Sequence, residues 1–64
     1  MIVVNGTEYD FEGLVVEELI SALGVEPRGI AVARNGEVVR RSAWTTTPLE
    51  RGDRVEIVTA VAGG

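Results

Sequence analysis

The sequence predicts an α+β fold in which one helix packs on one face of a mixed sheet of four to five strands. Three patterns predict it: two Asn-Gly pairs that each follow an apolar run, one stretch with helical spacing, and a final alternating run. The 64 residues are enough for one domain, and 45% hydrophobic with 25% charged residues is a globular composition. The expected order of elements is β-β-α-β-β-β.

The first two strands are expected to form a hairpin over residues 1–11. An apolar run of four residues ends at Asn5-Gly6, a pair that tolerates the positive φ of a type I′ turn. Beyond the turn, acidic side chains alternate with Thr, Tyr and Phe. This period of two is typical of a half-buried strand whose acidic side faces solvent.

The helix is predicted at about residues 14–23. Four apolar residues recur at the spacing i, i+3, i+4 and i+7, which places them on one helix face: Val16, Leu19, Ile20 and Leu23. Gly24 follows at the position where a left-handed residue commonly ends a helix, and Pro27 comes soon after.

A second hairpin is expected from residues 29–34 and 37–40. The two runs are joined by Asn35-Gly36, which repeats the turn signal of the first hairpin. Residues 41–49 are expected to form an irregular crossing with one short helical turn.

A tight polar turn at residues 50–53 leads into a last strand from Arg54 to about Ala60. The first strand is apolar on both faces, which fits an interior place in the sheet. The last strand is its expected parallel neighbour, and this is the β-grasp arrangement. We therefore expect one domain over residues 1–59 and a flexible tail over residues 60–64.

Composition excludes several functional classes. The sequence has no His, Cys or Lys, so the usual bases, thiolate nucleophiles and Cys-based metal sites are missing, and a self-sufficient enzyme is not expected. The acidic residues do not have metal-ligand spacing. The net charge of −4 argues against nucleic acid and against an anionic membrane surface. With no export signal in the sequence, we expect a cytoplasmic protein.

The last five residues carry the most specific chemical signal: Ala60, Val61, Ala62, Gly63 and Gly64. A diglycine end can enter a channel too narrow for side chains, and it places a carboxylate at the tip. Joining that carboxylate to AMP makes a mixed anhydride, which can yield a thioester, an amide or a thiocarboxylate. Small residues also collect at chain ends without a function.

The sequence resembles the ubiquitin-fold sulfur carriers, and most closely those of thiamine thiazole biosynthesis. The resemblance covers essentially the whole chain and is most specific at residues 33–44, which hold an Asn-Gly-Glu turn and an Arg three residues before Trp. It continues through residues 49–53, 55–58 and 62–64. Many members carry Pro where this chain has Arg40, a difference at a strand end that leaves the tail unaffected.

The resemblance implies a carrier on which other proteins act. A ubiquitin-activating-type adenylating enzyme would use ATP and magnesium to convert the Gly64 carboxylate to an acyl-adenylate. Sulfur from a cysteine desulfurase relay would then leave a Gly64 thiocarboxylate, and thiazole synthase would accept that sulfur. Ala62 and Gly63 would thread into the partners' active sites, and the chain itself would bind no cofactor. Because the chain has no Cys, its C-terminus is the only place for covalent sulfur.

Candidate partner contacts lie next to the tail at Val58, Ala60 and Val61. Val58 has a second interpretation, as a residue on the second face of a central strand. Trp44 is expected to cap the open end of the core, and the alternative is an interface contact.

Three charged residues have simple structural interpretations. Arg40 and Arg41 are expected to be solvated, with pairing to an acidic partner as the alternative. Asp53 is expected to be a turn residue that accepts hydrogen bonds from local backbone.

Three rival interpretations remain open from the sequence. The same tail chemistry serves a carrier for molybdopterin or another sulfur metabolite. A ubiquitin-like protein modifier would instead form an amide with lysines of its targets. A plain β-grasp interaction module with an accidental Gly-Gly end is a third interpretation.

Overall fold

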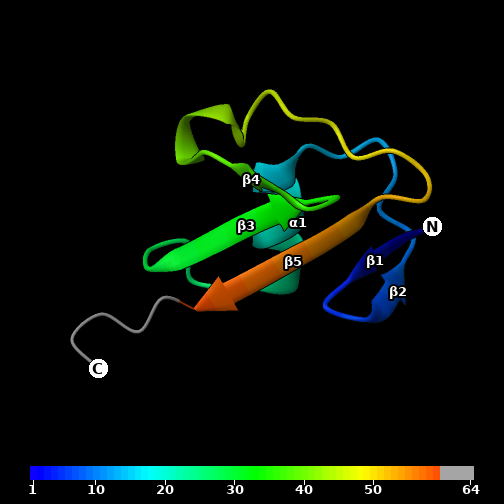
Figure 1. Cartoon of the computed structure of the whole chain (residues 1–64), viewed down its shortest axis with the longest axis horizontal. Coiled ribbons are helices and arrows are strands. Elements are labelled where there is room, and N and C mark those ends of the chain that lie inside the picture. The colour runs from blue at the N-terminus through cyan, green and yellow to red at the C-terminus, as the bar shows by residue number, and fades with distance from the viewer. Residues whose placement is uncertain (60–64) are drawn as a thin grey trace.

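One five-stranded sheet and one α-helix, joined by turns and loops, make up the fold of residues 1–59, which are the residues that this computed structural model describes (Figure 1). The elements are β1 (Ile2–Val4), β2 (Thr7–Tyr9), α1 (Val16–Leu23), β3 (Ile30–Arg34), β4 (Glu37–Val39), the short 3-10 helix η1 (Arg41–Ala43) and β5 (Arg54–Thr59). The predicted order is confirmed. The largest differences in boundary are that β2 ends at Tyr9 rather than at residue 11, and that α1 begins at Val16 rather than at about residue 14.

The strand order across the sheet is β2-β1-β5-β3-β4. β1 and β5 run parallel, and the other neighbouring pairs run antiparallel. The last strand therefore lies at the centre of a mixed sheet, beside the first strand, as the sequence predicts. This is the β-grasp topology.

The core lies between α1 and the face of the sheet that the helix covers (Figure 1). Its buried hydrophobic residues come from α1, from the strands β1, β3 and β5, and from the irregular crossing before β5: Ile2, Val4, Val16, Leu19, Ile20, Val32, Trp44, Leu49 and Val55. Three of the four helix positions predicted to face the core are buried, and Leu23 is partly buried. Full burial of each aliphatic side chain contributes about 1.5–3 kcal/mol.

Local signals explain both ends of α1 and both tight turns. The Glu18 carboxylate accepts a hydrogen bond from the Val15 N–H at 2.9 Å, which satisfies a free donor at the helix start. Gly24 has φ +70° and ends the helix in the left-handed conformation. Asn5 and Asn35 also have positive φ, 49° and 52°, as the two predicted Asn-Gly turns require.

None of the helices in residues 1–59 is long and apolar enough to cross a membrane.

Candidate functional site

The residues predicted to carry the chemistry lie outside the described part of the chain. They are Ala60, Val61, Ala62, Gly63 and Gly64. The structure does place the point from which they follow. β5 ends at Thr59, which is opposite Ile30 at the start of β3, so the tail leaves from the end of the central strand.

An apolar patch on the helix-free face of the sheet lies beside this point. We call it the sheet-face patch and define it by Ala31, Ala33, Val38 and Val58. These residues line a shallow hollow of about 180 Å³. Val38 is 75% exposed and Val58 is 59% exposed, which is unusual for valines in a sheet. The patch is therefore a surface that a partner could cover.

The structure shows one of the two interpretations of Val58, its place on the second face of the central strand, while a partner contact there stays a prediction. It lies on the second face of the central strand, opposite Ala31 in the register of β3 and β5. That face carries no helix within residues 1–59, so the side chain is exposed rather than buried. Glu56, on the same face of β5, puts a carboxylate at the edge of the hollow.

Trp44 belongs to the core, as predicted. It is 3% exposed, and its indole Nε1 donates a hydrogen bond to the Val39 carbonyl at 3.0 Å. The bond satisfies the polar atom of the indole, and the ring closes the core at the end of the irregular crossing.

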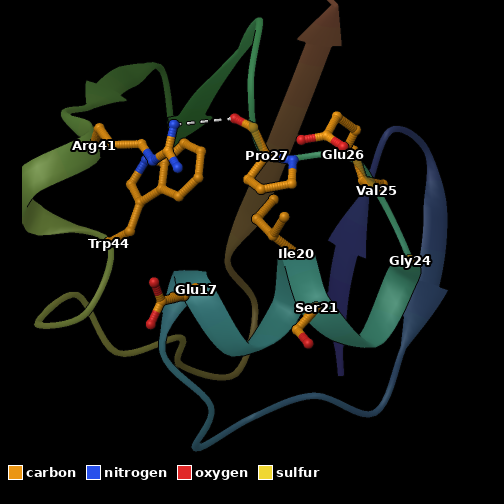
Figure 2. Close-up of a pocket in the computed structure, with 9 residues that line it drawn as sticks. All are labelled: Glu17, Ile20, Ser21, Gly24, Val25, Glu26, Pro27, Arg41 and Trp44. Atoms are coloured by element: carbon orange, nitrogen blue, oxygen red, sulfur yellow. Dashed lines mark hydrogen bonds between the residues drawn. The ribbon is translucent and has the colours of Figure 1, made fainter.

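A second hollow, of about 430 Å³, lies on the helix side next to Trp44 (Figure 2). Ile20 and Pro27 form part of its wall, and Arg41 lies over the Trp44 ring with 4.9 Å from the guanidinium carbon to the ring centre. Figure 2 also shows the hydrogen bond that the Arg41 Nη1 donates to the Pro27 carbonyl at 3.3 Å. Arg41 is exposed, as expected of a solvated charge, and it also holds the helix–strand loop against η1.

Asp53 is the most buried charged group in the described residues, with 6% exposure. Its carboxylate accepts hydrogen bonds from the Glu50 N–H at 2.8 Å, the Arg34 Nε at 2.7 Å and the Asn35 Nδ2 at 3.0 Å. The first is the predicted local turn contact. The other two come from β3 and its turn, and no pattern in the sequence predicts them.

These contacts set the ionisation of Asp53. Burial of the carboxyl raises its pKa, but the hydrogen bonds from Glu50, Arg34 and Asn35 outweigh burial, and the net pKa lies below the ordinary value of 3.8. The hydrogen bond to the Asp53 carboxylate in turn raises the pKa of Arg34. Asp53 therefore stays ionised and fixes the turn that starts β5, which is a structural role. The described residues contain no group of acidic side chains that could hold a metal ion.

Comparison with known proteins decides the family. The model of the ThiS family matches residues 2–64, almost the whole chain and including the diglycine. The chain belongs to the ThiS family. It is 36% identical over 64 residues to the "Sulfur carrier protein ThiS" of Thermus thermophilus, with 100% of both chains covered.

Longer relatives contain a segment similar to this ThiS-family chain. This chain is 41% identical over 64 residues to a thiazole synthase of Paramagnetospirillum magneticum. The match covers 98% of this chain and 20% of the thiazole synthase. The chain thus spans about a fifth of that relative's length.

Solved ThiS structures have the same fold. A crystal structure of the thiamine biosynthesis protein ThiS of Geobacter metallireducens matches with a TM-score of 0.82 and 40% identity, over 98% of this chain and 97% of the other. A solution structure of a thiamine biosynthesis protein from the same organism matches with a TM-score of 0.76 and 40% identity, over 98% and 86%. These matches confirm the β-grasp fold that the sequence predicts.

Proposed function

We propose that this chain is a sulfur carrier for the formation of the thiazole ring of thiamine. The full-length match to the Thermus thermophilus sulfur carrier protein ThiS carries the proposal, because it spans the whole fold and the diglycine together. The chain is then a carrier on which enzymes act, and we expect it to work in the cytoplasm.

The reaction takes place at the Gly64 carboxylate. A carboxylate oxygen attacks the α-phosphorus of ATP in an adenylating partner that uses magnesium, which releases pyrophosphate and leaves an acyl-adenylate. A persulfide of a cysteine desulfurase relay then attacks the Gly64 carbonyl carbon and displaces AMP. A thiol cleaves the resulting acyl disulfide at its S–S bond and becomes part of a new disulfide. The product is a thiocarboxylate, whose sulfur passes to thiazole synthase. Glycine at positions 63 and 64 leaves no side chain to obstruct these approaches.

The sheet-face patch supports the docking step of this proposal. Val58, close to the start of the tail, and Val38, on β4, present apolar surface, and Glu56 adds a charge at its edge. Burying such a patch would position the tail in a partner's active site. Thiazole synthase is proposed as one partner, because relatives of that name contain a segment similar to this chain.

The test is the intact mass of the chain after incubation with an adenylating partner, ATP, magnesium and a sulfur donor. We expect a shift that corresponds to one oxygen replaced by one sulfur, confined to the fragment that ends at Gly64. A Gly64→Ala variant should be activated much more slowly, and one residue appended after Gly64 should abolish the shift.

Two outcomes would contradict the proposal. One is no mass shift in the wild-type chain while the same partner activates another carrier. The other is full activity of the extended variant in a thiazole-forming assay. Covalent higher-mass adducts on a denaturing gel of cell extract would instead favour a protein modifier.

A further inference from the structure

The second half of the central strand β5 has a neighbouring strand on one side only. On that side, β3 pairs with it from Val55 to Thr59. On the other side, β1 pairs only with Arg54 and Val55 before the chain turns into β2. Figure 1 shows the β1–β2 hairpin beside the first part of β5, while the arrowhead of β5 extends beyond it. The last residues of β5 therefore lack the second strand that holds its start.

The side chain of Asn5 takes the place of the missing strand at Ile57. Its Nδ2 donates to the Ile57 carbonyl at 3.1 Å, and its Oδ1 accepts from the Ile57 N–H at 2.9 Å. The Val55 carbonyl accepts the Asn5 N–H at 3.0 Å on the same side. Because backbone groups alternate along a strand, Ile57 is the next residue to face that side. One side-chain amide thus makes both bonds that a peptide group of a neighbouring strand would make.

Asn35 is the counterpart of Asn5 at the other end of β5. Both residues belong to an Asn-Gly turn and have positive φ, 49° at Asn5 and 52° at Asn35. The Asn35 Oδ1 accepts a hydrogen bond from the N–H of Arg54, the first residue of β5, at 2.9 Å. Asn5 instead holds Ile57, two residues before the strand ends at Thr59. Both hairpin turns therefore fix β5, but only the first fixes it close to the end from which the tail follows.

We propose that Asn5 is a positioning residue for the reaction at Gly64, because it fixes the end of β5 that leads into the tail. The proposal rests on the proposed function and names the residue that prepares the carrier for its adenylating partner. A strand end held on both sides loses little freedom when a partner binds it. Without the Asn5 amide, only β3 would hold β5 beyond Val55, and binding would have to order that end. The cost falls on binding rather than on chemistry, because the Gly64 carboxylate is unchanged.

Two glycine substitutions form a matched pair for the test. Asn5→Gly and Asn35→Gly each remove one side-chain amide from an Asn-Gly turn, and glycine accepts the positive φ at both positions. Asn35→Gly also removes a bond to the Asp53 carboxylate, so it should be the less stable variant. The Ile57 amide should nevertheless exchange its hydrogen faster in Asn5→Gly than in Asn35→Gly, because only Asn5→Gly removes its acceptor.

Sulfur acquisition at Gly64 supplies the functional measurement. The initial rate of thiocarboxylate formation is measured against carrier concentration with the adenylating partner, ATP, magnesium and a sulfur donor, at a temperature at which the variants are folded. We expect Asn5→Gly to raise KM about fivefold and to leave kcat unchanged, as the loss of about one net hydrogen bond from binding would do. Asn35→Gly should keep the wild-type KM and kcat, because its bond to Arg54 lies at the opposite end of β5.

The outcomes separate this inference from the proposed function. If the wild-type chain acquires sulfur and Asn5→Gly has the wild-type KM, or Asn35→Gly raises KM by the same factor, the positioning role is wrong and the carrier role stands. If Asn5→Gly does not fold, Asn5→Asp decides, because it keeps the acceptor for the Ile57 N–H and removes the donor to the Ile57 carbonyl. Asn5→Asp should also raise KM, and an unchanged KM overturns the proposal. If the wild-type chain acquires no sulfur from a partner that activates another carrier, the proposed function fails and the positioning role fails with it.

Discussion

Replacement of Asp53 by alanine should remove a large part of the stability of this small domain. The Asp53 carboxylate holds two parts of the chain together: its own turn at Glu50, and the end of β3 with its hairpin turn at Arg34 and Asn35. Its side chain is 8% exposed, so water cannot replace these bonds in the folded state without rearrangement. The substitution leaves three donors without their acceptor.

The size of the loss follows from those three bonds. A hydrogen bond to a charged group contributes about 1.5–3 kcal/mol, but Arg34 and Glu50 can be rehydrated when the carboxylate is gone. We therefore expect Asp53→Ala to lower the free energy of unfolding by about 2–3 kcal/mol. A domain of this length is stable by only ~3–5 kcal/mol. The variant should be folded at low temperature and close to unfolding at body temperature.

Urea unfolding at several pH values measures this loss and tests its cause. The pKa of Asp53 in the folded protein lies below the ordinary value of 3.8, so its contribution is present above the unfolded-state pKa. The contribution disappears as the pH falls through the folded-state pKa. The difference between wild type and Asp53→Ala should therefore be constant near neutral pH and shrink below about pH 4.

Glu50→Gln is the matched control. It removes one acidic charge from the same turn, but the Glu50 side chain is 72% exposed and lies 3.9 Å from Arg34, so its loss should cost less than about 0.5 kcal/mol. The Glu50 N–H that bonds to Asp53 remains. The reasoning is refuted if both variants lose the same stability, or if the loss in Asp53→Ala does not change with pH.

Two further predictions concern the helix end and the sheet-face patch. Gly24→Ala should lower the free energy of unfolding by about 1 kcal/mol, because the backbone at this position has φ +70° and an alanine there is strained even though its Cβ would meet nothing within 4 Å. Thermal unfolding should show a lower midpoint, and an unchanged midpoint would contradict the prediction. Val58→Asp should change the free energy of unfolding by less than about 0.5 kcal/mol, because the side chain is 59% exposed. The same substitution should weaken binding to the adenylating partner in a calorimetric titration, and unchanged affinity would mean that the sheet-face patch is not part of the docking surface.

The sequence predicts those parts of the fold that depend on local chemistry. Each Asn-Gly pair defines its turn through the positive φ of two adjacent residues, and Gly24 marks the helix end in the same way. The parallel pairing of β1 and β5 follows from the order of elements and from the apolar first strand. These features need only short windows of sequence or general topology.

The contacts that the sequence does not predict join residues far apart in the chain. Asp53 bonds to residues 18 and 19 positions away, and Asn5 bonds to Ile57 across 52 positions. Leu49 is buried although it lies in an irregular crossing with no periodicity. Such contacts depend on strand register, which no local pattern of these residues encodes.

The candidate site was predictable only in part for the same reason. The composition of the tail points to chemistry at Gly64, which lies outside the described residues. Val58 shares its face of β5 with the charged residues Arg54 and Glu56. One apolar residue in that pattern does not tell whether the face is covered. Val58 is exposed because no helix within residues 1–59 covers this face of the sheet, and that is a property of the whole fold.

Burial and strand pairing differ between the start and the end of the central strand β5. At its start, the Asp53 network fixes the chain, and at Val55 the strand is buried and paired on both sides. At Thr59, it is exposed and paired on one side only. A free edge invites self-association, but this one is short, and the net charge of −4 opposes contact between copies. Substitutions early in β5 should therefore change the free energy of unfolding, whereas substitutions of the exposed Val58 near its end should leave the free energy of unfolding almost unchanged.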